Sequence, residues 1–198
     1  MQEKCTTPNG SLPVLTAFFT PLEQDLHHII AECRQGNRKA QEQLYRQFYG
    51  FAMTIAMRYA TDEHEAGDIL CQAFVKMFRS LHTYDSTKGN FHGWLKKIVI
   101  HESLDHIKQR SRFTSLEQEV VEEPFVNNSI IEKTDAAAIL DLVRKLPPAT
   151  HAVFVLYAME GYAHKEIAAQ LNISEGTSKW HLSEARKILQ QKLTINRV

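Results

Sequence analysis

Several features that often mark a protein's environment are scarce or missing in this sequence. Only three cysteines occur among 198 residues, at Cys5, Cys33 and Cys71. Because they are odd in number and widely spaced, a disulfide framework is not expected and a reducing compartment is. No apolar run approaches the roughly 18 residues that a membrane span needs, and the short apolar stretch at residues 12–19 lacks the basic start of a signal peptide. The sequence therefore predicts a soluble, cytoplasmic protein without membrane insertion.

A surplus of charge is also absent, since 23 Lys and Arg balance 23 Asp and Glu. The total alone does not indicate a nucleic-acid binder. The local balance differs: basic residues outnumber acidic ones by six to three in residues 85–112 and again in residues 161–198, and acidic residues outnumber basic ones by seven to one in residues 113–143. The neutral total therefore hides two mildly basic blocks separated by an acidic one.

The motifs of common catalytic and metal sites are missing as well. The chain has no HExxH, no Cys-x-x-Cys pair and no Gly-rich phosphate loop. Ten histidines invite a metal site, and His27, His28 and Cys33 lie close in sequence. Histidines scattered over helix surfaces are more often structural or solvated, so we expect no catalytic residue, no metal and no cofactor. An enzyme remains a minor alternative that a metal assay would detect.

Apolar residues recur at helical spacing from about residue 23 onward, and no segment alternates with period two. An all-α chain is therefore expected, with two small helical domains joined by a flexible acidic linker. The expected parts are a loose N-terminal tail (1–22), a first domain (23–112), the linker (113–135) and a second domain (136–198). Within the first domain, a loop is expected at residues 84–90, followed by a helix from residue 91 to about residue 109.

Near the C-terminus, residues 163–171 and 175–193 form two predicted helices joined by a tight turn, which is helix-turn-helix spacing. Ser174 is well placed to cap the second helix. At 100° per residue, five positions of that helix share an inward face: Ser178, Leu182, Ala185, Leu189 and Leu193. The other faces are expected to contact DNA in the major groove through Gly176, Thr177, Lys179, Trp180, Ser183, Glu184 and Lys187.

Trp180 leaves two interpretations open at this point. On an outward face its indole would contact a thymine methyl group or a sugar edge. Alternatively, it is partly buried against a neighbouring helix, as many surface aromatics are. Lys179 and Lys187 are expected to contact phosphates, which strengthens binding without reading sequence.

Two stretches of the chain resemble conserved regions of a known family. The first is DILCQAFVKMFR at residues 68–79, followed by NFHGWLKKI at residues 90–98. The second comprises LPPA at 146–149, EGYAHKEIA at 160–168 and ISEGTSK at 173–179. Together they are similar to the second and fourth conserved regions of extracytoplasmic-function (ECF) sigma factors, the smallest class of bacterial sigma factors. The order, the spacing and the intervening linker all agree with that family.

The resemblance implies a sigma factor, not an enzyme, that binds core RNA polymerase and directs promoter-specific initiation of transcription. It implies polymerase contacts at Asp68, Gln72, Lys76 and Arg79. It implies melting and base capture at the −10 element by Lys88, Asn90, Trp94, Lys96 and Lys97, and recognition of the −35 element by the helix-turn-helix. It also implies a further partner, an anti-sigma factor. Ala163 departs from the family pattern, since a Ser or Thr helix cap is usual there.

Two other functions compete with this interpretation. A stand-alone regulator with a LuxR-like helix-turn-helix domain would explain the last 60 residues or so, but would leave the residue 68–98 match without a purpose. A sigma-like subunit that has lost its promoter function is the other. The sequence argues against that possibility only through its intact recognition helix.

Overall fold

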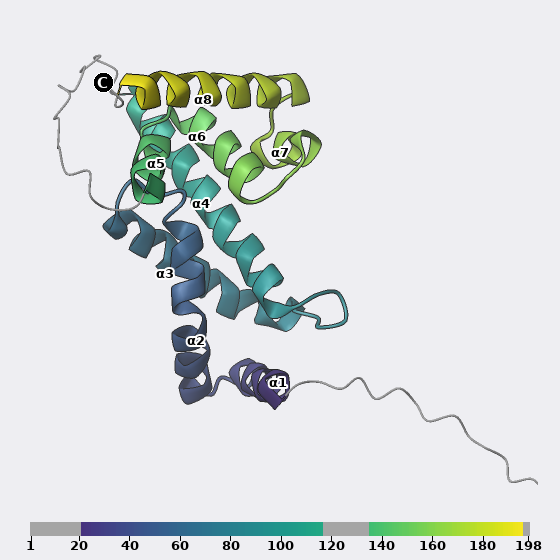
Figure 1. The fold of residues 1–198 in the computed structure, drawn as a ribbon. Helices are drawn as coiled ribbons and strands as arrows, with labels where there is room; N and C mark the ends of the chain where they lie inside the picture. Colours follow the sequence, from purple (N-terminus) through teal and green to yellow (C-terminus); the bar gives the residue numbers. More distant parts are fainter. Residues whose placement is uncertain (1–20, 117–134, 196–198) are drawn as a thin grey trace, which may run out of the picture.

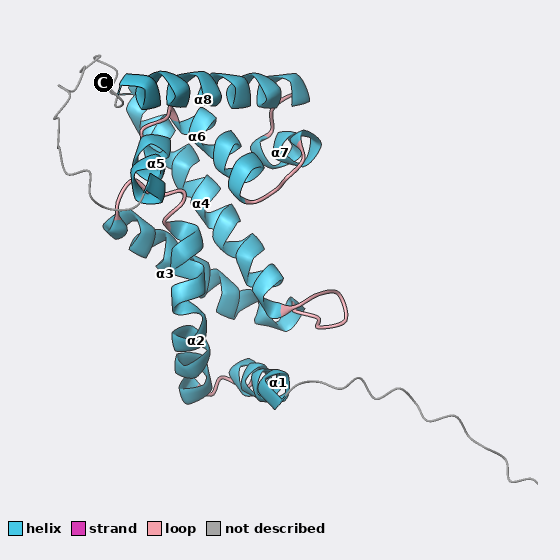
Figure 2. Ribbon diagram, viewed as in Figure 1, coloured by secondary structure: helices cyan, strands magenta, loops and turns pink. Residues whose placement is uncertain are grey.

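The structure, a computed structural model, describes residues 21–116 and 135–195 of the chain. All regular structure in these residues is helical (Figure 2), which confirms the all-α prediction. Most of the expected N-terminal tail and of the expected acidic linker lies outside the described residues.

The described residues 21–116 contain four α-helices and a short 3₁₀ helix: α1 (Pro21–Arg34), α2 (Arg38–Ala56), α3 (Glu63–Ser80), η1 (Leu81–Thr83) and α4 (Phe91–Leu116). Asn37 caps α2, because its side-chain oxygen accepts the amides of Lys39 and Ala40. Asp62 caps α3 in the same way, through the amide of Glu65. The helix α4 runs past its expected end near residue 109 and into the segment assigned to the linker.

The helices α2, α3 and α4 pack against one another into a bundle, and α1 lies across the lower end of α2 (Figure 1). Large side chains from all parts of the bundle are completely buried, including Leu44, Phe48, Met77, Phe91 and Leu95. The rings of Phe48 and Phe91 meet edge to face with centroids 4.7 Å apart. This core holds the exposed faces of α3 and α4 at fixed positions.

The second half contains α5 (Asp135–Arg144), α6 (Pro148–Phe154), the π-helical turn η2 (Val155–Met159), α7 (His164–Leu171) and α8 (Glu175–Ile195). Asn172 ends α7 in the left-handed conformation, with φ of 56°. Ser174 then caps α8 by accepting the amide of Thr177 at 2.9 Å, as the sequence predicted. These two local features produce the tight turn between α7 and α8.

The inward face of α8 is largely as predicted. Ser178, Leu182, Ala185 and Leu189 are buried against α6 and α7. Leu193 was predicted to share that face, but it is 41% exposed. It lies in the last turns of the helix, where too little of the domain remains beneath it to cover its side chain.

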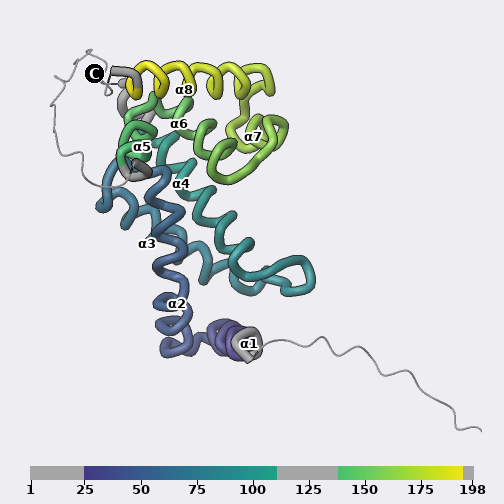
Figure 3. The backbone as a smooth tube through the Cα atoms, in the orientation of Figure 1, coloured from purple at the N-terminus to yellow at the C-terminus, as the bar shows by residue number. Residues whose placement is uncertain are grey.

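The two halves of the chain are in contact. The long helix α4 passes beside α6, and the chain path shows α8 lying across the end of the molecule above both (Figures 1 and 3). The buried apolar residues of both halves form one continuous cluster.

None of the helices in the described part of the chain is both long and apolar enough to cross a membrane.

Candidate nucleic-acid interface

The outward face of α8 is open to solvent. Trp180 is 59% exposed, so the second interpretation of this residue, burial against a neighbouring helix, does not hold. Exposed positions surround it: Gly176, Lys179, Ser183, Arg186 and Lys187. Thr177 and Glu184, also predicted for this face, are half-buried at its margins. A large apolar ring among small polar and basic groups suits a contact with base edges and phosphates.

A cavity of about 430 Å³ adjoins this face, between α8 and the start of α7. Three cationic side chains line it: Lys179, Arg186 and Lys187. Arg186 joins the predicted phosphate contacts from the flank of the helix, where its fork of N–H groups suits a phosphate. Lys179 is also paired with Glu175 at 2.9 Å, an exposed contact that contributes little to stability.

Two histidines brace α8 from beneath. His181 Nδ1 lies 3.0 Å from the hydroxyl of Thr150 in α6, and His164 Nδ1 lies 2.9 Å from the buried hydroxyl of Ser178. Burial lowers the pKa of His181, so the neutral ring is favoured and can share a hydrogen bond with the hydroxyl. These contacts fix the rotation of α8 about its axis and hence the direction in which Trp180 points.

The loop between η1 and α4 projects from the far end of the bundle (Figure 3). Lys88, in this loop, is exposed and lies 3.6 Å from Asp85. Asn90 has a structural role, since its side-chain oxygen accepts the amide of Gly93 at 2.8 Å and so caps α4. Trp94 is half-buried and packs against the rings of Tyr84 and Phe91, with centroid distances of 5.4 and 5.5 Å.

The two neighbouring lysines of α4 differ in their surroundings. Lys97 is exposed. Lys96 is half-buried, and its Nζ lies 2.6 Å from Oε2 of Glu160 in the other half of the chain. The sequence motif predicted both lysines as equivalent contacts, and the structure separates them.

The residues predicted to contact a polymerase lie together on the outer face of α3. Asp68, Gln72, Lys76 and Arg79 are all exposed. Two of them have partners: Asp68 lies 3.5 Å from His64, and Lys76 is paired with Glu102 of α4. The stripe is thus continuous, as the spacing of three and four residues requires.

An apolar groove beside that stripe was missed by the sequence reasoning. It has a volume of about 290 Å³, and its lining includes Tyr45 and Tyr49 of α2 and Cys71, Val75 and Phe78 of α3. Tyr45, Tyr49 and Val75 are exposed although they are large and apolar. The signal in the sequence was a Tyr pair at i and i+4 outside the buried stripe of α2, which marks a second apolar face.

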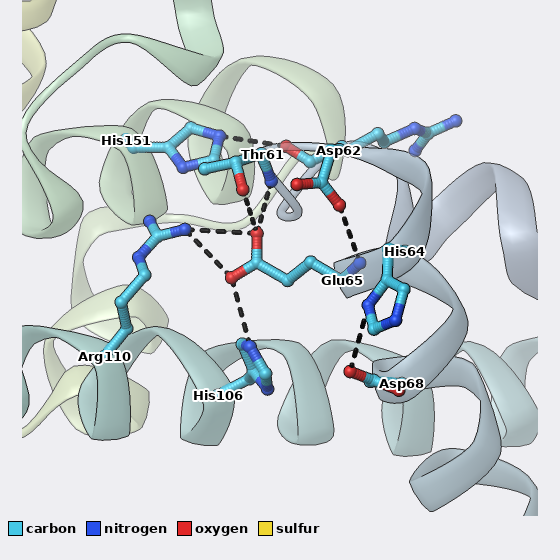
Figure 4. Close-up of polar contacts among 9 residues, drawn as sticks. Thr61, Asp62, His64, Glu65, Asp68, His106, Arg110 and His151 are labelled. Carbon is cyan, nitrogen blue, oxygen red and sulfur yellow. Dashed lines mark hydrogen bonds and ion pairs between the residues drawn. The ribbon is translucent and has the colours of Figure 1, made fainter.

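A polar network at the start of α3 was also missed. The carboxylate of Glu65 accepts hydrogen bonds from the amide and hydroxyl of Thr61 and from the guanidinium of Arg110, and lies 3.0 Å from His106 (Figure 4). Burial opposes ionisation of Glu65, but these donors and charges outweigh it and lower the pKa of the carboxyl. The network fixes α3 to the middle of α4.

The described residues contain no group of three or more His, Cys, Asp or Glu side chains placed to hold a metal ion, so His27, His28 and Cys33 form no such cluster.

Sequence profiles of known families match both halves of the chain. The profile described as Sigma-70 region 2 matches residues 44–113, and the profile described as Sigma-70, region 4 matches residues 136–189. The chain belongs to the sigma-70 family, as a sigma factor of the ECF type. Sigma factors direct RNA polymerase in transcription initiation and are not enzymes.

Similar proteins are described as RNA polymerase sigma factors. ECF RNA polymerase sigma factor SigE of Mycolicibacterium smegmatis is 27% identical over 158 residues, covering 77% of this sigma factor and 61% of that protein's own length. RNA polymerase sigma-H factor of Pseudomonas aeruginosa is 23% identical over 185 residues, covering 86% of this chain and 94% of that one. ECF RNA polymerase sigma factor SigM of Mycobacterium tuberculosis H37Rv is 27% identical, covering 94% and 93%.

A solved structure has the same fold. It is the sigma factor RpoE of Bartonella quintana in complex with the anti-sigma factor NepR, which is 18% identical and aligns with a TM-score of 0.50. The alignment covers 88% of this sigma factor and 97% of that chain.

Proposed function

We propose that this sigma factor recognises the −35 element through the outward face of α8. The observation that carries the proposal is the position of Trp180, a 59% exposed indole in the second turn of a recognition helix whose rotation is fixed by contacts on its opposite face. Gly176 and Ser183 leave room beside the ring for base edges, and Lys179, Arg186 and Lys187 supply cations for flanking phosphates.

We propose that the −10 element is opened and held by the loop before α4 and the first turns of that helix. Lys88 and Lys97 are exposed there and can contact the backbone of a single strand. The half-buried Trp94, supported by Tyr84 and Phe91, offers a ring on which a base can stack. Asn90 contributes by fixing the start of α4 and thus the position of these residues.

We propose that core RNA polymerase binds the α3 stripe of Asp68, Gln72, Lys76 and Arg79, together with the apolar groove beside it. A polar stripe next to an exposed apolar groove is the usual composition of a protein interface, in which an apolar centre has a polar rim. Tyr45 and Tyr49 supply the large aromatic surface that often dominates the binding energy.

We also propose an anti-sigma factor as a partner of this chain and the cytoplasm as its location. Support comes from RpoE of Bartonella quintana, which has the same fold and was solved with an anti-sigma factor. We keep the domain organisation proposed from the sequence, although α1 begins at Pro21 in the proposed tail, and α4 ends at Leu116 and α5 begins at Asp135 within the proposed linker of residues 113–135.

Run-off transcription tests the proposed function. Core RNA polymerase is incubated with a pool of genomic fragments, with and without this protein, and the transcript starts are mapped. New starts that share two upstream elements are expected. If the protein neither co-elutes with core enzyme nor produces new starts, the proposal is wrong and a stand-alone helix-turn-helix regulator becomes the better explanation.

A further inference from the structure

Glu160 connects the two halves of the sigma factor. It follows the π-helical turn η2, and its amide donates to the carbonyl of Val155 at 3.1 Å. Its side chain is 0% exposed. Oε1 accepts a hydrogen bond from the guanidinium of Arg58 at 2.7 Å, and Oε2 lies 2.6 Å from Nζ of Lys96 in an ionic contact without hydrogen-bond alignment. A carboxylate from the C-terminal half is thus held between two cations of the N-terminal half.

Neighbouring polar contacts converge on the same corner of the molecule, the turn after α2. His151 of α6 donates from Nε2 to the carbonyl of Arg58 at 2.9 Å, and Arg144 of α5 donates to the carbonyl of Met57 at 3.2 Å. Carbonyls at the end of a helix lack partners within the helix, so they are ready acceptors for donors from another domain. The C-terminal half therefore docks at a defined site on the N-terminal half.

The cation pair is suited to a second ligand. Arg58 and Lys96 together carry two positive charges against the single charge of Glu160, and in the absence of that carboxylate they would present two convergent donors to solvent. A phosphate group offers such donors the same kind of oxygen acceptors as a carboxylate and carries comparable or greater charge. Lys96 also lies one residue from Lys97, an exposed proposed contact of the −10 strand.

The closed arrangement keeps the two DNA-reading surfaces closer together than the centres of the two promoter elements. The centres of a −10 and a −35 element lie about 25 base pairs apart, which is about 85 Å at about 3.4 Å per base pair. From Glu160 to Trp180 the chain measures only about 45 Å even when its helices and turns are laid end to end. Because Lys96 lies 2.6 Å from Glu160 in the closed form, Trp180 stays within about 50 Å of Lys96, well short of the distance between the centres of the two elements in straight DNA.

We propose that Arg58 and Lys96 form a phosphate-binding pair for the promoter strand, and that Glu160 occupies this pair in a closed conformation of the free sigma factor. Docking of the C-terminal half and binding of DNA at the pair exclude each other. Opening of the chain exposes the pair at the same time as it separates the two DNA-reading surfaces. The inference rests on the proposed function for its −10 assignment, and it adds Arg58 as a DNA contact and Glu160 as its intramolecular competitor.

The closed conformation is tested by distance measurement on the full chain. Spin labels are attached at Gln47→Cys on α2 and Gln191→Cys on α8, both exposed positions, in a chain in which Cys5 and Cys71 are replaced by serine. The labelled chain with Glu160 intact should give one short, narrow distance distribution. Glu160→Gln should broaden it and lengthen it, and Glu42→Gln, which removes an exposed ion pair within α2, should leave it unchanged. Identical distributions for Glu160→Gln and the parent chain would overturn the proposal.

The phosphate-binding pair is tested with a short fluorescein-labelled single-stranded DNA of mixed sequence, at about 50 mM salt. Glu160→Gln should bind this DNA about fivefold or more tightly than the parent, because the closed population no longer reduces the binding-competent fraction. Addition of Arg58→Gln should abolish the gain. If Glu160→Gln lengthens the spin-label distance but binds the single-stranded DNA with the affinity of the parent chain, the proposal is overturned.

Misfolding is controlled by far-ultraviolet circular dichroism of Glu160→Gln, whose helix content should equal that of the parent chain. Run-off transcription separates this inference from the proposed function. If the distances and affinities change as expected but the protein supports no transcript starts with core polymerase, the proposed function fails and the proposed closed conformation is retained.

Discussion

The two proposed DNA-reading surfaces of this sigma factor are presented in different ways. On α8, Trp180, Ser183 and Lys187 are exposed, and the contacts that hold the helix come from its opposite face. On α4 and its preceding loop, Asn90 is occupied as a helix cap, Trp94 packs against two neighbouring rings and Lys96 is bound by Glu160. The proposed C-terminal surface is exposed, whereas part of the proposed N-terminal surface is occupied by contacts within the chain.

This difference suggests a division of work between the domains. A duplex element can be read by a rigid helix whose side chains already point outward. A single strand exists only after the duplex opens, so a surface for it gains from being covered until then. The apolar groove beside α3 is on the same domain, but is lined by other residues than the closed contact, and thus stays available to a protein partner in the closed form.

The largest effect is expected on the free energy of unfolding, from a substitution in the core beneath α4. Phe48→Ala removes a buried ring that contacts Phe91 at the start of α4, and should lower the free energy of unfolding by about 3–5 kcal/mol. Urea denaturation followed by circular dichroism measures this. Tyr49→Ala, an exposed aromatic on the same helix, should cost at most about 1 kcal/mol. Equal losses would mean that α2 is not oriented as described.

The next largest effect is expected on transcription initiation, from a substitution on the outward face of α8. Trp180→Ala should reduce initiation at −35-dependent promoters by the equivalent of about 1–3 kcal/mol, with folding and polymerase binding unchanged. Transcript yield and co-elution with core enzyme measure the two quantities. Leu193→Ala, at another exposed apolar position of α8, should change neither. A parallel loss of polymerase binding in Trp180→Ala would assign the indole to packing.

A pH effect is expected at the contact between the domains. Burial lowers the pKa of His151, and the charges of Arg110 and Arg144 act in the same direction, against opposing contributions from the Arg58 carbonyl and Glu65. As pH falls below the ordinary value of about 6.5, the unfolded chain binds a proton that the folded chain does not, so stability is present above this pH and decreases below it. Protonation also disfavours docking, because an imidazolium would be buried.

Urea denaturation at about pH 7.5 and about pH 5.5 measures this dependence. His151→Gln retains a donor for the Arg58 carbonyl and does not titrate, so its stability should fall less between the two pH values than that of the parent chain. His181 has a lowered pKa for the same physical reason and titrates in both chains, so only the difference between them reports on His151. If His151→Gln loses as much stability between the two pH values as the parent chain does, the assignment to His151 is wrong.

The smallest effects are expected at the two caps of the helix-turn-helix. Ser174→Ala removes the oxygen that accepts the Thr177 amide and should cost about 0.5–2 kcal/mol. Ala163→Ser should have the opposite sign and stabilise by about 0.5–1 kcal/mol, because Ala163 has an extended cap conformation without a side-chain acceptor. Thermal denaturation of both variants compares them. Stabilisation by Ser174→Ala would show that the cap is not formed in solution.

Much of the architecture could be predicted from the sequence because it depends on neighbours along the chain. Apolar residues at helical spacing placed the helices, Ser174 marked the start of α8, and the motif around Asp68 placed the exposed stripe of α3. The errors occur where a local pattern meets the edge of the structure. Leu193 continues the inward stripe of α8 beyond the domain beneath it, and α4 continues through a segment whose acidic neighbours indicated a linker.

The sequence by itself determined the all-α class, the helix-turn-helix and the family, because each follows from spacing within a few turns of one helix or from short motifs, whereas the exposure of Trp180 was decided by the structure. The tertiary structure alone decided that Lys96, and not the exposed Lys97, meets a carboxylate from the other half of the chain. Lys96 and Arg58 meet Glu160 across separations of 64 and 102 residues. No periodicity reaches that far, since such a contact arises only when two separately folded cores bring their surfaces together and a buried carboxylate must find its counter-charges.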